Sequence, residues 1–110
     1  MALGLRMLRG VLIREGVKSA KNLVPDEILV NDACAVVIDE ESRIIYLWVG
    51  DDTSVTDRFK AARIAQMLNW KMFGGAARIV QDKDEIKRTL TKFARIDEEI
   101  PYGELKLIIG

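Results

Sequence analysis

The hydrophobic residues of the chain fall into runs that predict paired β-strands. Residues 33–38 form an almost continuous apolar run of the length typical of a buried central strand. Residues 43–49 (RIIYLWV) are rich in β-branched and aromatic residues and end at Gly50, which predicts a second strand. Residues 39–42 lie between the two runs, so we expect a turn there and a β-hairpin as the result.

A long helix is predicted after this hairpin. Ser54 and Asp57 have the S-x-x-D form of a helix-capping arrangement. The helix is expected to continue to about Met72, because Gly74 and Gly75 then interrupt the helical pattern.

Shorter elements complete the predicted order. Residues 77–81 predict a short strand, and residues 105–109 predict a last strand. Between them a second, shorter helix is expected to begin at Asp82 or Asp84 and to continue to about Ala94. Residues 24–26 are expected to form an approach loop. Residues 5–18 fit an edge strand or a short helix equally well by periodicity alone. With a strand there, the order predicts an α+β fold with a mixed sheet and a helix on each face.

The long helix has two apolar faces. One face is expected to pack on the sheet, since five of its residues lie within about 100° of each other when successive residues are placed 100° apart. These residues are Ala61, Ile64, Ala65, Leu68 and Met72. Phe59, Met67 and Trp70 lie on the opposite side, interleaved with Thr56 and Arg63. Burial of one face does not explain them, so this second face is either a contact surface or is covered by the amino-terminal segment or a second copy.

Composition restricts the function further. The 110 residues are 49% apolar, which predicts a single domain over residues 1–110 with one core. Seventeen basic and seventeen acidic residues balance, which argues against a nucleic-acid binder and a generally basic membrane-surface protein. With no histidine and a single cysteine, zinc sites and Ser-His-Asp or Cys-His catalysis are excluded. We therefore expect no enzyme, a buried Cys34, and oxygen ligands at any metal site.

The first residues do not predict membrane targeting. Residues 1–17 are apolar in part, but Arg6, Arg9 and Arg14 interrupt them, so a signal peptide or membrane span is not indicated. A cytoplasmic location is expected. The high charge content and the scarcity of Asn and Gln suggest a thermophilic prokaryotic source.

Three motifs together resemble a known family. An Asn31-Asp32 pair opens the first buried strand, Tyr46-x-Trp48-x-Gly50 ends the next one, and Asp57 precedes Arg-x-Lys-Ala-Ala at residues 58–62. This combination is similar to a gelsolin-like domain of the gelsolin, severin and villin superfamily, in the form of a single-domain archaeal protein. The resemblance covers roughly residues 28–82. It implies a strand at residues 5–18 and a central mixed five-stranded β-sheet between one long and one short α-helix.

The resemblance also implies a function. In gelsolin-like domains the outward side of the long helix packs into the cleft between actin subdomains, which assigns partner contacts to Phe59, Arg63, Met67 and Trp70. Binding of actin or an actin homologue, with sequestering or weak capping of filaments, is the implied activity. Arg63 stands where the family often has a small apolar residue, which argues against tight capping. The alternative is a non-actin protein-interaction or homodimerisation domain with the same fold.

A calcium site is implied by the same resemblance. Its ligands correspond to Asp32, the Asn31 carbonyl and Asp57, and two carboxylates predict a weak site. Asp57 also suits helix capping, a role compatible with coordination. Family members share a second ion with actin through an acidic residue near the end of the long helix. This chain has Asn69 there, so we expect that shared site to be weakened or lost and Asn69 to belong to the contact surface.

Overall fold

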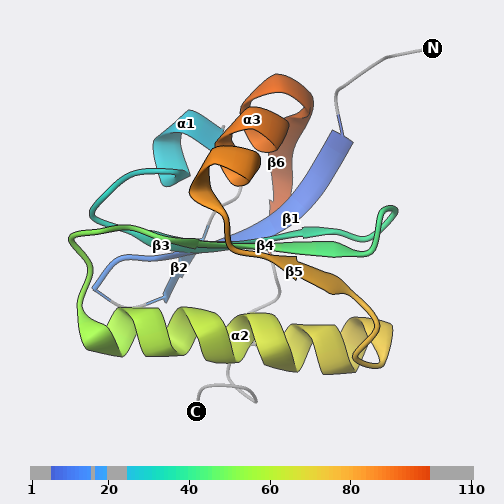
Figure 1. The fold of residues 1–110 in the computed structure, drawn as a ribbon, viewed down its shortest axis with the longest axis horizontal. Helices are drawn as coiled ribbons and strands as arrows, with labels where there is room; N and C mark the ends of the chain where they lie inside the picture. Colours follow the sequence, from blue (N-terminus) through green and yellow to red (C-terminus); the bar gives the residue numbers. More distant parts are fainter. Residues whose placement is uncertain (1–5, 16, 20–24, 100–110) are drawn as a thin grey trace.

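The computed structural model of the protein describes residues 6–15, 17–19 and 25–99, which form one mixed sheet with helices on both faces (Figure 1). The elements in chain order are β1 (Arg6–Ile13), β2 (Val17–Ser19), α1 (Pro25–Ile28), β3 (Cys34–Asp39), β4 (Ile44–Val49), α2 (Val55–Phe73), β5 (Arg78–Val80), α3 (Lys83–Phe93) and β6 (Ala94–Glu99). Among the described residues, no helix combines the length and apolar character needed to cross a bilayer.

The sheet has six described strands where five were expected. Its order is β2-β1-β3-β4-β5, with β6 also paired to β1. One edge of β1 is shared, because residues 6–10 pair with β6 in parallel and residues 11–13 pair with β2 in antiparallel orientation. The β1–β3 and β3–β4 pairs are antiparallel and β4–β5 is parallel. The predicted mixed sheet is therefore confirmed, and it is five strands wide because β2 and β6 divide one edge position.

The core lies in two layers, one on each face of the sheet. Helix α2 covers one face, and α1 with α3 covers the other (Figure 1). Residues of β3 alternate between the layers: Val36 and Ile38 pack with α2, whereas Ala35 and Val37 pack with the layer of α1 and α3. Both layers are closed to solvent, which explains the continuous apolar run that predicted this strand. Cys34 is fully buried, as expected.

Several elements differ from the sequence prediction. Residues 5–18 hold strand β1 and the start of a hairpin, so the strand interpretation is confirmed. Residues 25–28 form the short helix α1, where a loop was expected. Strand β6 follows α3 directly at Ala94 and was not predicted. The predicted strand at residues 105–109 lies outside the described residues.

Candidate functional site

Helix α2 is capped at both ends. Ser54 has the extended backbone of an N-cap residue, and its Oγ accepts a hydrogen bond from the Asp57 N–H at 3.0 Å. At the other end Gly74 has a φ of 60°, and its N–H donates to the Trp70 carbonyl at 3.1 Å. Both predicted ends of this helix are confirmed to within a residue, and the caps satisfy backbone groups that the helix ends leave without intrahelical partners.

The face of α2 directed away from the sheet carries large exposed apolar side chains. Among the described residues these are Val55, Phe59 and Trp70, at 81%, 69% and 69% exposure, and Met67 at 42%. Val55, Phe59 and Trp70 lie within about 60° of one another around the helix axis, opposite the residues that face the core. We call Val55, Phe59, Met67 and Trp70 the outer stripe. An apolar set of this kind on one rigid helix indicates a site for another molecule.

An open groove of about 360 Å³ borders the first half of the outer stripe. It is lined by Val55, Thr56, Phe59, Lys60 and Arg63. Val55 and Phe59 supply apolar surface, while Lys60 and Arg63 supply positive charge. In the described part of the chain neither cation has an ion-pair partner. The groove therefore suits an apolar group with carboxylates at its edge.

The side-chain amide of Asn69 forms hydrogen bonds inside the domain. Its Oδ1 accepts the Ala77 N–H at 2.9 Å, and its Nδ2 donates to the Ala77 carbonyl at 3.3 Å. These bonds connect the last turn of α2 to the segment that enters β5. Asn69 is thus a stabilising residue in the structure, and its predicted contact with a partner stays a prediction. The other residues predicted for the partner surface are all exposed on α2: Phe59, Arg63, Met67 and Trp70.

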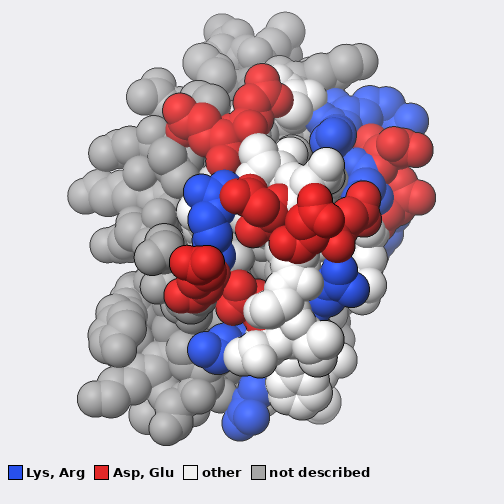
Figure 2. All heavy atoms as spheres, turned by 90° about the vertical axis from the view of Figure 1, so that its left-hand side faces the viewer, with Lys and Arg blue, Asp and Glu red and all other residues white. Residues whose placement is uncertain are grey.

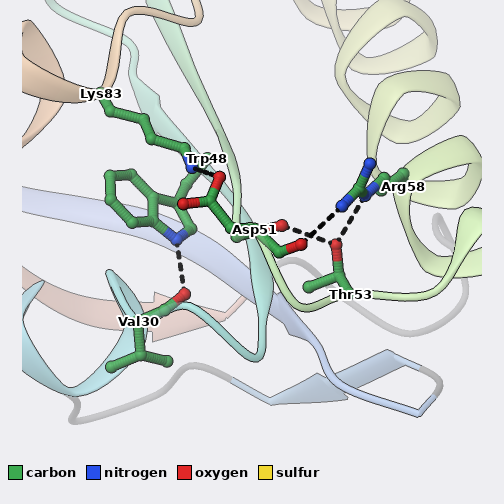
Figure 3. Close-up of polar contacts among 7 residues, drawn as sticks. Val30, Trp48, Asp51, Thr53, Arg58 and Lys83 are labelled. Carbon is green, nitrogen blue, oxygen red and sulfur yellow. Dashed lines mark hydrogen bonds and ion pairs between the residues drawn. The ribbon is translucent and has the colours of Figure 1, made fainter.

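The Tyr-x-Trp-x-Gly motif belongs to the core on the opposite face of the sheet. Tyr46 and Trp48 are 4% and 2% exposed. The Trp48 Nε1 donates to the Val30 carbonyl at 2.9 Å, and the Lys83 ammonium lies 5.4 Å from the centre of the indole ring (Figure 3). Trp48 therefore joins the turn before β3 to the start of α3, and the two tryptophans of this chain have different roles.

Gly50 follows β4 at a point where a neighbouring turn leaves no space for a side chain. A Cβ there would lie 2.3 Å from the Asn31 carbonyl oxygen and 2.6 Å from that of Ala33. The Gly50 N–H donates to the Ala33 carbonyl at 3.0 Å, and the Asp52 N–H donates to the Asn31 carbonyl at 2.8 Å. The glycine of the motif thus permits the turn before β3 to lie against the loop that enters α2.

Two cations fix this loop between β4 and α2 (Figure 3). The Arg58 guanidinium donates to the Thr53 Oγ1 at 2.9 Å and to the Asp51 carbonyl at 2.8 Å. The Lys83 ammonium donates to the Asp51 carboxylate. This hydrogen bond, followed by the positive charge of Lys83, lowers the pKa of Asp51 from its ordinary value of 3.8. The Arg of the Arg-x-Lys-Ala-Ala motif therefore positions the start of α2.

The residues predicted to bind calcium lie around the amino-terminal end of α2. Asp57 is 6% exposed, and its Oδ2 accepts the Glu15 N–H at 2.8 Å. The Asp32 side chain is 64% exposed in the turn before β3, and the Asn31 carbonyl accepts the Asp52 N–H. Carboxylate and carbonyl oxygens match the chemistry that calcium prefers. Calcium binding by these three residues stays a prediction.

This end of the molecule is rich in carboxylates, with basic side chains among them (Figure 2). In the described ranges no three acidic or cysteine side chains group closely enough to hold a metal by themselves. A calcium shell would therefore need backbone carbonyls and water as well as Asp32 and Asp57.

Two residues at these sites were not singled out from the sequence. Val55 extends the outer stripe, and its signal was its helical spacing of four residues from Phe59. Arg14 pairs with Asp32 at 2.9 Å. Nothing in the local sequence indicated that pair, because the two residues meet only when β1 and β3 form their antiparallel ladder.

Comparisons with known proteins identify a solved structure with a similar fold. No protein-family model matches the sequence, and no curated protein matches it. A chain in the crystal structure of the Thorarchaeota ProGel/rabbit actin complex is similar in structure, with a TM-score of 0.52 and 20% sequence identity. The match covers 93% of this chain and 99% of that chain. The protein therefore has a gelsolin-like α+β fold, as the motifs predicted.

Proposed function

We propose that this protein is a gelsolin-like module that binds actin or an actin homologue through the outer stripe of α2. The observation that carries the proposal is the exposure of Val55, Phe59 and Trp70 on a capped helix whose other face is fully used by the core. The likeness to a chain of the ProGel/rabbit actin complex supports actin as the partner.

The physical basis is burial of the outer stripe in an apolar cleft. An amphipathic helix can bind a groove through side chains spaced by three or four residues, and Phe and Trp are effective anchors because they bury large areas. Phe59 and Trp70 are eleven residues apart, about three helical turns, so they contact the partner at two separated points. A cleft that accepts both points would fix the orientation of the domain.

Charge near the groove gives the partner a second requirement. Lys60 and Arg63 line the groove beside Phe59. A partner with carboxylates at the edge of its cleft would associate faster at low salt and be held in register. We expect binding to weaken as ionic strength rises, and Arg63→Glu to weaken it most at low ionic strength, where its charge is least screened.

The activity that follows is sequestering of monomers or weak capping. The described residues present one outer stripe, and severing requires contact with a filament at a second surface. As part of the same proposal, Asn31, Asp32 and Asp57 hold a calcium ion, which would neutralise carboxylates at the start of α2 and stabilise the domain.

Actin binding is tested with charged substitutions on the two faces of the domain. Met67→Glu and Trp70→Glu place a carboxylate on the outer stripe, and Arg88→Glu is the control on α3 at the opposite side of the sheet. Rabbit actin is polymerised with each variant, with calcium and with EGTA, and polymerisation rate and co-sedimentation are measured. We expect the wild type and Arg88→Glu to slow polymerisation equally.

The stripe variants are expected to lose this effect while they stay folded, with a fall in melting temperature of no more than about 5 °C. If the wild type has no effect in either condition, the actin proposal is wrong. Retention of full activity by Trp70→Glu and Met67→Glu would move the binding surface away from α2.

A further inference from the structure

We propose that Arg14 is a built-in cation at the predicted calcium site and competes with calcium for Asp32. The inference rests on the calcium part of the proposed function and is independent of actin. Arg14 and Glu15 are consecutive residues that follow β1, and each contacts a different predicted calcium ligand. The chain itself therefore supplies a positive charge where an ion is expected.

The contacts of this turn connect two parts of the fold. The Arg14 Nη2 donates to the Asp32 Oδ1 at 2.9 Å, and the Glu15 N–H donates to the Asp57 Oδ2 at 2.8 Å. Asp32 belongs to the turn before β3 and Asp57 to the first turn of α2. Glu15 has a φ of 51°, in the left-handed region that few non-glycine residues adopt. A calcium ion bound by both carboxylates would join these two parts of the fold. The hydrogen bonds from Arg14 and Glu15 already join them.

The third predicted ligand is also engaged. The Asn31 carbonyl accepts the Asp52 N–H at 2.8 Å. Calcium takes six to eight oxygen ligands, and a carbonyl oxygen with two lone pairs can keep one hydrogen bond while it binds an ion. The Asp52 bond therefore does not prevent coordination. Arg14 is different, because its positive charge repels the ion whichever oxygen of Asp32 the ion binds.

The Arg14 pair is weak enough to exchange. A single Nη2 bond connects it to Asp32, and its Nε is buried without an acceptor among the described residues. Bidentate pairing, the stronger arrangement for arginine, is absent from this described contact. The Asp32 side chain is 64% exposed, so water screens the pair. Calcium at high concentration can displace such a cation, whereas calcium at low concentration cannot.

As a consequence, the turn before β3 and the start of α2 are both held by the residues that follow β1, without calcium. A bound ion stabilises a protein only by its preference for the folded state over the unfolded state. If Arg14 already neutralises Asp32, calcium gains less from binding, and its apparent affinity falls. Replacement of Arg14 by a neutral residue removes the repulsion, and we expect the apparent Kd for calcium to fall by about tenfold.

The test measures melting temperature during a calcium chloride titration of the isolated protein, without actin. The variants are Arg14→Gln, which removes the charge, and Arg14→Lys, which keeps it. Arg78→Gln is the matched control, because Arg78 of β5 forms a similar exposed pair with Glu85 of α3 at 2.9 Å. Each variant is compared with its own melting temperature in EGTA, and magnesium chloride controls for ionic strength.

We expect Arg14→Gln to respond at about tenfold lower calcium than the wild type, Arg14→Lys and Arg78→Gln. Addition of Asp57→Asn should abolish the response. Equal responses in Arg14→Gln and the wild type, both abolished by Asp57→Asn, would overturn the role of Arg14 and leave the calcium site standing. No calcium response in any variant would overturn the site as well. An equal increase in calcium sensitivity in Arg78→Gln would show that the effect depends only on net charge, and would overturn the role of Arg14.

Discussion

The two tryptophans of this chain allow one substitution to be tested in two environments. Trp48 is 2% exposed in the core, and Trp70 is 69% exposed on the outer stripe. The same change to alanine should therefore give two different losses of stability. The comparison tests directly whether the outer face of α2 is free in the isolated protein.

Trp48→Ala is expected to be severe. Its indole is buried among residues of β3, β4 and α3, and the Lys87 ammonium lies 5.3 Å from the ring centre. Core Trp→Ala substitutions cost about 3–5 kcal/mol, because they lose buried area and leave a cavity. The Val30 carbonyl also loses its 2.9 Å hydrogen bond from Nε1. We expect a decrease of about 4 kcal/mol in the free energy of unfolding.

Trp70→Ala is expected to be mild. Roughly a third of a tryptophan surface of about 250 Å² is covered, which corresponds to about 2 kcal/mol as an upper limit. Part of that contact is with the turn at Gly75. Alanine has a better helix propensity by about 0.5 kcal/mol, which offsets some of the loss. We expect a decrease of about 1 kcal/mol.

The assay is urea unfolding followed by far-ultraviolet circular dichroism, which does not depend on the removed fluorophore. Each variant is measured at two protein concentrations, because self-association would raise stability only at the higher one. A loss for Trp70→Ala as large as that for Trp48→Ala would show that the outer stripe is covered in the free protein. A loss below about 1 kcal/mol for Trp48→Ala would refute its place in the core.

Two further substitutions test backbone geometry by thermal unfolding. Gly50→Ala should cost about 3 kcal/mol or more, since its Cβ would lie 2.3 Å from the Asn31 carbonyl oxygen and both atoms belong to the backbone framework. A wild-type melting temperature for this variant would contradict the close approach. Arg43→Gly should stabilise the protein by about 0.5–1 kcal/mol, because Arg43 is exposed and has a φ of 56°. A lower melting temperature would show that the Arg43 side chain contributes more than the relief of backbone strain.

The elements predicted well are those with strong local signals. Residues 33–38 and 43–49 are apolar runs of strand length, and the Ser54 cap with Gly74 defines the long helix. Strand β6 lacks such a signal, since its sequence ARIDEE is mostly charged and follows α3 without a break. It is a strand because β1 provides a parallel partner along residues 6–10. Pairing of that kind depends on the tertiary fold, which local patterns do not contain.

The same distinction applies to the candidate site. Phe59, Met67 and Trp70 were found because helical periodicity places them opposite the core. Asn69 lies beside Trp70 in the sequence, yet its amide is held by Ala77 once the chain reverses after α2. Arg14 was similarly missed, because its contact with Asp32 depends on the register of β1 with β3. Side chains that act through long-range contacts require the structure.

Actin binding and self-association would both use the outer stripe. Loss of binding in a Trp70 variant therefore does not distinguish the two hypotheses. The dependence on protein concentration distinguishes them, because a homodimer buries Trp70 without any other partner and dissociates on dilution. Sedimentation velocity of the wild type over a wide concentration range therefore decides first. A monomer throughout, together with a slowing of rabbit actin polymerisation that Trp70→Glu abolishes, assigns the outer stripe to actin. A dimer that Trp70→Glu converts to a monomer assigns the stripe to a second copy, and actin would then have to displace that copy to bind.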